Sequence, residues 1–368
     1  WREGRGRLRG LSLFTDAAKR SRRIGTVPGV EFIVSDEKLL TLSSSPHIRD
    51  GSSIPGVMHT VVMALLPGAA MGIYLFGLPA LLTIIIAIAS SVALEAWMQW
   101  IMGRRITVYD GSAILTGLLL AMNLPSSAPW WLTIIGSMVA IIVGKHLYGG
   151  LGQNIFNPAL VARVFLLISW PVQMTSFPAP SALLAKGVDA VATATPLSAI
   201  KMELMSHKAN IDITQLPQPS TFDLLLGAHS GSLGEVSIIA LLIGGLYLLY
   251  KRIITWHIPV SFIGTALAFS AIMWFVDPAK YANPVFHIMT GGLILGAFFM
   301  ATDYVTSPVT NKGMLIFGAG CGFLTILIRL FGGYPEGVSF AILLMNLATP
   351  LIDKLVTPSK FGEVKGNG

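Results

Sequence analysis

The feature that most constrains this chain is a series of long apolar runs joined by short polar connections. A helix needs about 20 mostly apolar residues to cross the hydrocarbon core of a bilayer. Only 12% of the 368 residues are charged, against about 25% in soluble domains. The chain is therefore expected to be an all-α integral membrane protein in the lipid bilayer. Its formal net charge of +7 does not indicate nucleic-acid binding, because the few charges cluster at the ends of apolar runs.

The apolar runs predict about ten transmembrane helices. Two of them, near 111–124 and 158–171, are short and are flanked by Gly, Asn or Pro. Short or broken segments persist at membrane depth only where protein buries them or where they line a cavity. We therefore expect a compact bundle with an interior site. The predicted helices lie near 56–76, 79–102, 111–124, 130–147, 158–172, 233–250, 257–276, 286–301, 313–331 and 337–353.

The basic residues between the runs predict the orientation of the helices, because Lys and Arg concentrate in cytoplasmic loops. With both termini in the cytoplasm, the basic connections all fall on the cytoplasmic side. They are Arg104-Arg105, Lys251-Arg252, Lys312, and the three residues Lys354, Lys360 and Lys365 after the last run. The segment 173–232 is then external.

Short sequence matches predict two internal repeats. Residues 147–150 recur as 330–333, residues 116–118 as 290–292, and Pro79 as Pro259, all at nearly constant spacing. Chance matches would have widely different spacings, so the nearly constant spacing indicates a repeat. Arg104-Arg105 ends one helix, whereas Lys251-Arg252 precedes the matching helix. If both pairs are cytoplasmic, the two five-helix repeats run in opposite directions, and a binding site is expected between them.

The longest polar interruption contains the segment Asp189-Ala190-Val191-Ala192-Thr193-Ala194-Thr195-Pro196-Leu197. No hydrophobic period runs through it, and Pro196 lacks a donor N–H. On composition alone, it is a loop of small residues. Its chemistry also offers a second interpretation, in which it presents a threonine hydroxyl, with a carboxylate upstream, to a modifying enzyme.

The segment resembles the flavin-attachment motif of membrane subunits of the Rnf and Na+-NQR respiratory complexes, roughly Asp-x-x-Ser/Thr-x-Ala-Thr. Asp189, Ala194 and Thr195 match this motif, and Pro196-Leu197 matches its continuation in the Rnf D subunit. Ala192 stands where a hydroxyl residue is usual, and Thr193 follows it. The resemblance implies that Thr195 carries FMN through a phosphoester, placed there by a flavin transferase.

Other stretches resemble the Rnf D subunit in the same order along the chain, from about 42 to 360. The most specific is 148–158, Tyr-Gly-Gly-Leu-Gly-Gln-Asn-Ile-Phe-Asn-Pro. Its alternative interpretation is a tight helix–helix turn, with Asn157 capping the next helix. The chain is identified as similar to the Rnf D subunit, with the NQR B subunit as a more distant relative. The resemblance to these two subunits implies a fold of two inverted repeats with short or broken helices, similar to the fold of urea channels. Further matches lie at 301–303, 331–337 and 350–353.

The resemblance also implies a function. The chain would be an electron-transfer subunit of a complex in the bacterial inner membrane that couples ferredoxin and NAD+ redox chemistry to Na+ or H+ translocation. Other Rnf-type membrane subunits, a second flavin-carrying subunit, and iron–sulfur and NAD-binding subunits would be its partners. A second, noncovalent flavin is left open. A solute or ion channel is the alternative function, since inverted repeats with broken helices suit a pore equally well.

The domain organisation follows from these patterns. We expect a basic cytoplasmic extension, a first membrane repeat, an external segment with the attachment motif, a second membrane repeat and a cytoplasmic tail. Their ranges are 1–41, 42–172, 173–232, 233–353 and 354–368.

Charged residues inside predicted helices are candidates for function, because removing a charge from water is costly. For Glu95, Arg163, Asp303 and Arg329, an interfacial position or a structural ion pair is the favoured interpretation. We expect Arg329 to extend toward the outer interface and His146 and His257 to lie at the cytoplasmic one. The single cysteine, Cys321, lies in an apolar run and is expected to be buried and inert. No catalytic site is predicted.

Overall fold

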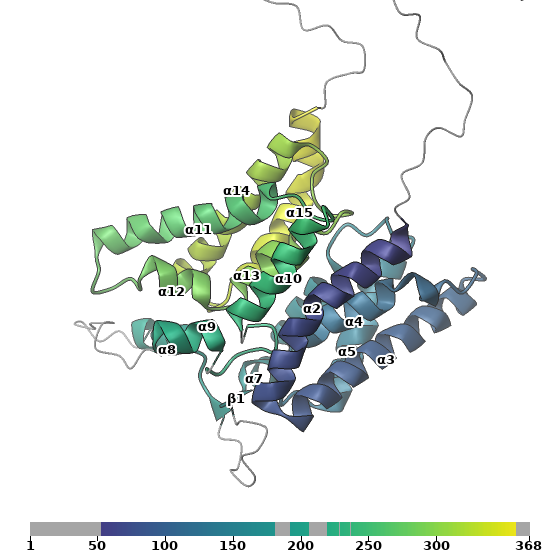
Figure 1. The fold of residues 1–368 in the computed structure, drawn as a ribbon, viewed down its shortest axis with the longest axis horizontal. Coiled ribbons are helices and arrows are strands. Elements are labelled where there is room, and N and C mark those ends of the chain that lie inside the picture. Colours follow the sequence, from purple (N-terminus) through teal and green to yellow (C-terminus); the bar gives the residue numbers. More distant parts are fainter. Residues whose placement is uncertain (1–52, 181–191, 206–218, 228, 236, 358–368) are drawn as a thin grey trace, which may run out of the picture. The chain divides into compact units, whose positions relative to one another are not determined.

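The computed structural model describes residues 53–180, 192–205, 219–227, 229–235 and 237–357. All of them belong to one compact unit, Ser52–Gly368. The described residues form 14 α-helices and one antiparallel pair of two-residue strands (Figure 1). The expected 1–41 extension and most of the 354–368 tail lie outside the described residues.

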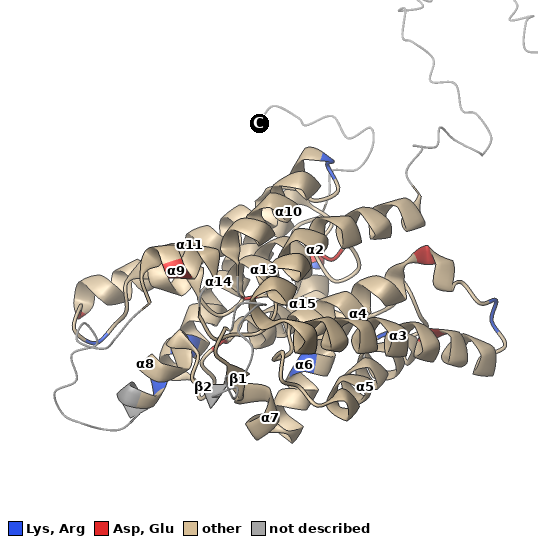
Figure 2. Ribbon diagram, turned by 60° about the horizontal axis from the view of Figure 1, so that its bottom comes forward, with Lys and Arg blue, Asp and Glu red and all other residues tan. Residues whose placement is uncertain are grey.

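Five helices are long and apolar enough to cross a membrane, judged by their length and composition. Their mean hydropathy lies between 1.5 and 2.1. Few charged residues interrupt them (Figure 2). They are α2 (Ile54–Phe76), α3 (Leu78–Ile101), α11 (His257–Val276), α14 (Asn311–Phe331) and α15 (Val338–Leu355).

Shorter helices occupy the other predicted positions. The two runs expected to be short form α4 (Ser112–Met122) and α6 (Pro158–Ser169), which confirms that expectation. The remaining apolar ones are α5 (Trp130–Met138), which continues as the π-helical η2 (Val139–His146), and α10 (Ile238–Tyr250). Short connecting elements are η1 (Val108–Asp110), α7 (Pro171–Thr175), β1 (Phe177–Pro178), β2 (Ala192–Thr193), α8 (Pro196–Met205) and α9 (Thr221–Leu226).

Polar side chains fix where several helices begin. Each residue before the helix accepts a hydrogen bond from a backbone N–H of the first turn, which has no partner within the helix. Asn157 does so for α6, as the sequence predicted. The others of this kind are Ser53 before α2, Ser237 before α10, Asn283 before α12 (Pro284–Met289) and Thr310 before α14.

The helix expected near 286–301 is broken into pieces, contrary to the prediction of one continuous helix. It consists of α12 (Pro284–Met289), α13 (Leu293–Leu295) and the π-helical η4 (Gly296–Met300). Gly291 and Gly292 have φ angles of 68° and 64°. Glycine adopts this left-handed conformation without steric cost, whereas other residues rarely do. These two glycines end α12 and redirect the chain.

The packing of the two halves follows a similar pattern. In the first half, α3 contacts α4 and α5, and α6 contacts η2. In the second half, α11 contacts α12 and α14, and α15 contacts α14. The first long helix of the chain, α2, packs on α10. Gly244 permits this contact, because a Cβ atom there would collide with the Ala64 carbonyl oxygen.

Candidate functional site

Thr195, the predicted attachment residue, caps the helix that follows it. Strand β2 precedes it and pairs with β1, with Thr193 opposite Phe177. The Thr195 Oγ1 accepts a hydrogen bond from the Ser198 backbone N–H at 3.1 Å and lies 2.7 Å from the Ser198 hydroxyl oxygen. Only 4% of Thr195 is exposed. The hydroxyl is therefore held at the N-terminus of α8.

Several contacts hold α8 against its neighbours. The Lys201 ammonium donates hydrogen bonds to the backbone carbonyls of Arg329 and Leu330, at 2.8 and 3.3 Å, where α14 ends. Burial lowers the pKa of Lys201. The Ser230 hydroxyl donates to the Ala194 carbonyl at 2.8 Å. A small apolar cluster also fixes the helix, made of Leu197, Ile200, Leu224, Ala282 and Phe286. The position of Thr195 is thus set by strand β1, by Leu224 and Ser230, and by contacts with the second half of the chain.

A cavity of about 80 Å³ lies beside Thr195. We call it the Thr195 cavity. Segments far apart in sequence line it, namely α6, residues 171–177, α8 and residues 334–340. One wall is aromatic, with the rings of Tyr334 and Phe340 stacked at 4.8 Å between centroids. Its charged and hydroxyl-bearing residues include Arg163, Thr195, Ser198, Glu336 and Ser339.

Arg163 is the buried cation of this cavity, with a side chain only 6% exposed. Its Nη1 donates to Asn123 Oδ1 at 2.6 Å. Its Nη2 lies 3.4 Å from Glu235 Oε1 and also forms an ion pair with Glu336. We call Arg163, Glu235 and Glu336 the Arg163 cluster. It joins α6 of the first half to two loops of the second, which agrees with the expectation of a structural ion pair.

Arg329 is buried as well, which corrects the expectation that it extends toward the interface. It is 3% exposed. Its guanidinium donates to the backbone carbonyls of His287, Thr290, Gly291 and Glu336. It therefore satisfies carbonyls that the break after α12 leaves without helical partners, and it ties that break to the loop before α15.

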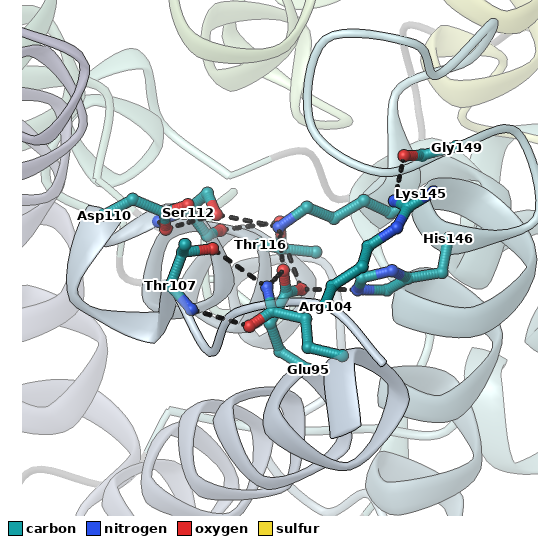
Figure 3. Close-up of polar contacts among 10 residues, drawn as sticks. Glu95, Arg104, Thr107, Asp110, Ser112, Thr116, Lys145, His146 and Gly149 are labelled. Atoms are coloured by element: carbon teal, nitrogen blue, oxygen red, sulfur yellow. Dashed lines mark hydrogen bonds and ion pairs between the residues drawn. The ribbon is translucent and has the colours of Figure 1, made fainter. Parts of the chain in front are cut away.

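A second buried set of charges lies within the first half (Figure 3). Lys145 Nζ donates to both Glu95 oxygens at 2.9 Å and to Ser112 Oγ at 2.7 Å. Gln99 Nε2 donates to Glu95 Oε1 at 2.9 Å, and His146 Nε2 lies 3.3 Å from Glu95 Oε2. We call Glu95, Lys145 and His146 the Glu95 cluster.

This arrangement bears on two expectations from the sequence. For Glu95, the structural ion pair is the interpretation that the structure confirms. His146 is 3% exposed and lies against Glu95, so it is buried within the protein. His257 is partly buried and stacks on Trp256 at 4.1 Å between ring centroids. Cys321 is fully buried, as expected.

Lys145 of the Glu95 cluster lines a larger cavity of about 310 Å³. Lys145, Ser112 and Thr116 contribute polar groups on one side, and Asn154 and Asp303 contribute others. Most of the lining is apolar and comes from α2, α4, α10 and η4. The cavity therefore offers an amphipathic ligand an apolar body with a few polar contacts.

The structure describes only part of the predicted attachment motif. Asp189 lies outside the described residues. Thr193 and Ala194 are described as backbone leading into Thr195, through β2 and the Ser230 hydrogen bond. The structure therefore brings Thr195 to a cavity, but it does not test the role of Asp189 or Thr193.

Four site residues were missed by reasoning from the sequence: Lys145, Glu235, Glu336 and Ser339. Lys145 had a usable signal, because it is a charge inside an apolar run. Glu235 and Glu336 stand in polar connections, where a carboxylate predicts nothing specific. Ser339 sits in the first turn of an apolar helix. Among the described residues, no group of three or more His, Cys, Asp or Glu residues could hold a metal ion.

Comparison with known proteins gives consistent matches over most of the chain. The model of the NQR2, RnfD, RnfE family matches residues 41–362. The chain is 48% identical over 332 residues to the D subunit of the Na(+)-translocating ferredoxin:NAD(+) oxidoreductase complex of Acetobacterium woodii, covering 90% of this chain and 98% of the relative. It is 49% identical over 327 residues to the D subunit of the proton-translocating ferredoxin:NAD(+) oxidoreductase complex of Clostridium ljungdahlii, covering 89% and 97%. The D subunit of the ion-translocating oxidoreductase complex of Stutzerimonas stutzeri is 44% identical over 332 residues, covering 84% and 93%.

Proposed function

This chain belongs to the NQR2, RnfD, RnfE family and, within it, to the D subunits of Rnf complexes, and on that premise we propose that it carries a covalent FMN on Thr195. It then serves as a membrane electron-transfer subunit of an ion-translocating ferredoxin:NAD+ oxidoreductase. Other Rnf-type membrane subunits, a second flavin-carrying subunit, and iron–sulfur and NAD-binding subunits are its partners. The observation that carries the proposal is a threonine hydroxyl at the attachment position, held beside a cavity whose lining includes Arg163, Ser198 and Ser339.

The residues present fit such a group. The hydroxyl of Thr195 sits at the start of α8, where backbone N–H groups and the helix dipole favour an attached anion. The adjoining cavity of about 80 Å³ is too small for the flavin ring but has room for a phosphoryl group. FMN, when bound, accepts electrons and passes them on. Thr195 would hold the group covalently, and the residues that line the cavity would fix its position.

We further propose that the fold consists of about ten crossings in two inverted five-helix repeats, spanning 42–172 and 233–353. The matching helix contacts of the two halves support this assignment. The basic connections support cytoplasmic termini, including the 1–41 extension and the 354–368 tail. The segment 173–232, with Thr195, is then on the external side of the bacterial inner membrane.

The proposal also gives the larger cavity a role. A cavity of about 310 Å³ lies within the usual range of sites for small organic ligands. We propose this cavity as the place for a second, noncovalent flavin, because its lining combines apolar surface with polar groups of Thr116, Asn154 and Asp303.

Two conservative substitutions test the attachment residue. Thr195→Val keeps the shape of the side chain and removes the oxygen, so covalent flavin fluorescence in a denaturing gel should disappear while membrane insertion persists. Thr193→Val should retain the fluorescence. If Thr195→Val stays fluorescent and Thr193→Val does not, the attachment residue is Thr193. If both stay fluorescent, the flavin is attached elsewhere and the attachment motif has no such role. A wild-type band without flavin fluorescence would favour the channel alternative.

Thiol labelling tests the orientation. Met202 is 61% exposed on α8. In a Cys321→Ala background, Met202→Cys should react with a membrane-impermeant thiol reagent in intact cells. Labelling that occurs only after lysis would place α8, and with it Thr195, in the cytoplasm.

A further inference from the structure

We infer that the Thr195 cavity is a phosphate site, in which Arg163, Ser339 and the N-termini of α8 and α15 hold the phosphoryl group of the attached FMN. This inference rests on the proposed function, because it names the groups that receive one part of that cofactor. The ligand chemistry is a singly charged phosphodiester, or inorganic phosphate when no flavin is attached.

Two helix N-termini meet at this cavity. Helix α8 begins at Pro196, directly after Thr195, and helix α15 begins at Val338. Residues 195, 198, 337 and 339, all in or next to these first turns, line the cavity. Gly337, the residue before α15, supplies no side chain to cap it. The Ser198 N–H already donates to Thr195 Oγ1 and the Val338 N–H to the Glu336 carbonyl. The positive ends of the two helix dipoles nevertheless face a common space, which favours an anion.

An unpartnered hydroxyl points to a missing ligand. Ser339 is only 4% exposed and lines the cavity. Its Oγ has no hydrogen-bond partner within the part of the chain that the structure describes. A buried hydroxyl without a partner costs free energy, and a ligand that supplies an acceptor would remove that cost. A phosphoryl oxygen would accept its proton.

Arg163 supplies the positive charge. It lines the cavity and is 5% exposed. A guanidinium presents several N–H groups in one plane and suits phosphate oxygens well. Glu235 pairs with this cation without lining the cavity, whereas Glu336 lines the cavity and pairs with Arg163 from inside it. Glu336 is thus the group that competes with a phosphoryl oxygen.

The role of Glu336 separates an anion site from a cation site. If the cavity binds phosphate, removing the Glu336 charge frees Arg163 and strengthens binding. If the cavity binds a cation such as Na+, Glu336 is a ligand, and removing its charge weakens binding. The same substitution, Glu336→Gln, therefore gives opposite results for the two chemistries.

The first experiment uses the full chain, purified without flavin from cells that lack a flavin transferase. Inorganic phosphate, added at constant ionic strength against chloride, should raise the melting temperature of the wild type by roughly 2–4 °C. Glu336→Gln should enlarge this rise, Ser339→Ala should reduce it, and Arg163→Gln should abolish it. No rise in the wild type, or a smaller rise in Glu336→Gln, overturns the phosphate site.

The second experiment remains informative if Arg163→Gln fails to fold. Ser339→Asp places a carboxylate in the first turn of α15, where an anion site would receive it. The flavin-free variant should melt at or above the wild-type temperature and should no longer respond to phosphate. Ser91→Asp is the matched control, since Ser91 is also a buried, unpartnered serine but lies mid-helix in α3. Its melting temperature should fall sharply. If Ser339→Asp falls equally, the inference is wrong.

The two proposals fail separately. Wild-type protein made with a flavin transferase is first examined for covalent flavin in a denaturing gel. If it carries none, the proposed function fails, whatever the phosphate titration shows. If flavin is attached to Thr195 but phosphate does not bind and Ser339→Asp is destabilised, only the phosphate site fails.

Discussion

The Glu95 cluster and the Arg163 cluster are both buried sets of opposite charges, but they differ in where their partners come from. Glu95, Lys145 and His146 all belong to the first half, and both carboxylate oxygens bind the same ammonium at 2.9 Å. Arg163 binds carboxylates from two loops of the second half. The first cluster stabilises one half, whereas the second joins the two halves beside Thr195.

The clusters also differ in what they leave unsatisfied at the adjoining cavity. Lys145 faces the larger cavity with its ammonium bound to Glu95 and Ser112. The Thr195 cavity instead contains the unpartnered Ser339 hydroxyl and the uncapped start of α15. A set of charges that is already paired points to a structural role, whereas an unpartnered buried hydroxyl beside the proposed attachment residue points to a ligand.

The largest expected effect is the loss of one partner from the Glu95 cluster. Glu95→Ala leaves the Lys145 ammonium buried without its counter-charge, and breaking a buried pair in this way costs about 3–5 kcal/mol. Thermal unfolding in detergent measures the loss of stability. The double variant Glu95→Gln with Lys145→Met should recover most of it. The proportion of folded protein that carries flavin should stay unchanged. A fall in that proportion would contradict a purely structural role for the Glu95 cluster.

A second test disturbs the contact between halves on which the Arg163 cluster depends. Gly244→Ala places a methyl group against the Ala64 carbonyl oxygen, where α10 meets α2. Overpacking of this kind costs about 1–3 kcal/mol. It should lower both the unfolding temperature and flavin attachment. Gly264→Ala is the matched control, because no atom lies within 4 Å of its added Cβ. An equal effect of the two substitutions would contradict the packing described for α2 and α10.

A smaller effect is expected at Lys201, which fixes α8 behind Thr195. Lys201→Met keeps the apolar stem and removes the hydrogen bonds to the carbonyls of residues 329 and 330. The expected loss of stability is about 1–2 kcal/mol. Fluorescence anisotropy of the attached flavin should fall, because α8 is held less firmly. Unchanged anisotropy would mean that other contacts suffice to fix the segment.

The smallest effect concerns pH and His229, which lies next to Glu235 in the loop before α10. Burial lowers the pKa of His229 from 6.5, although Glu235 acts in the opposite direction. The unfolded chain therefore binds this proton at a higher pH than the folded chain does. The contribution of neutral His229 to stability is complete above pH 6.5 and is lost as the pH falls toward the folded pKa. The slope is at most about 1.4 kcal/mol per pH unit. His229→Gln should flatten the fall in melting temperature between pH 7 and 5. An identical fall in both proteins would exclude His229 as its source.

The sequence predicted the helices well because membrane-length apolar runs have few alternative structures. Each of the ten predicted positions contains a helix. The break after α12 was not predicted, since Gly291-Gly292 inside an apolar run is compatible with a continuous helix until the backbone conformation is known. Hydropathy reports which segments are apolar, not where a helix bends inside the bundle.

The candidate site was predictable only in part, because its motif is local but its surroundings are not. Thr195 follows from adjacent residues. Arg163 and Glu235 are 72 residues apart, and Glu95 and Lys145 are 50 apart. Charge inside an apolar run indicated that Glu95 and Arg163 need partners, but no period in the sequence says which distant residue supplies one. That information comes from how the helices pack.

Mass spectrometry of the peptide that contains Thr195 tests the central claim most directly. The protein should be produced with a flavin transferase, digested under denaturing conditions and fragmented so that Thr193 and Thr195 are distinguished. An added mass of one FMN less one water is expected on Thr195, with Thr193 unmodified. An unmodified peptide at full recovery, or a modification on Thr193 alone, would contradict it.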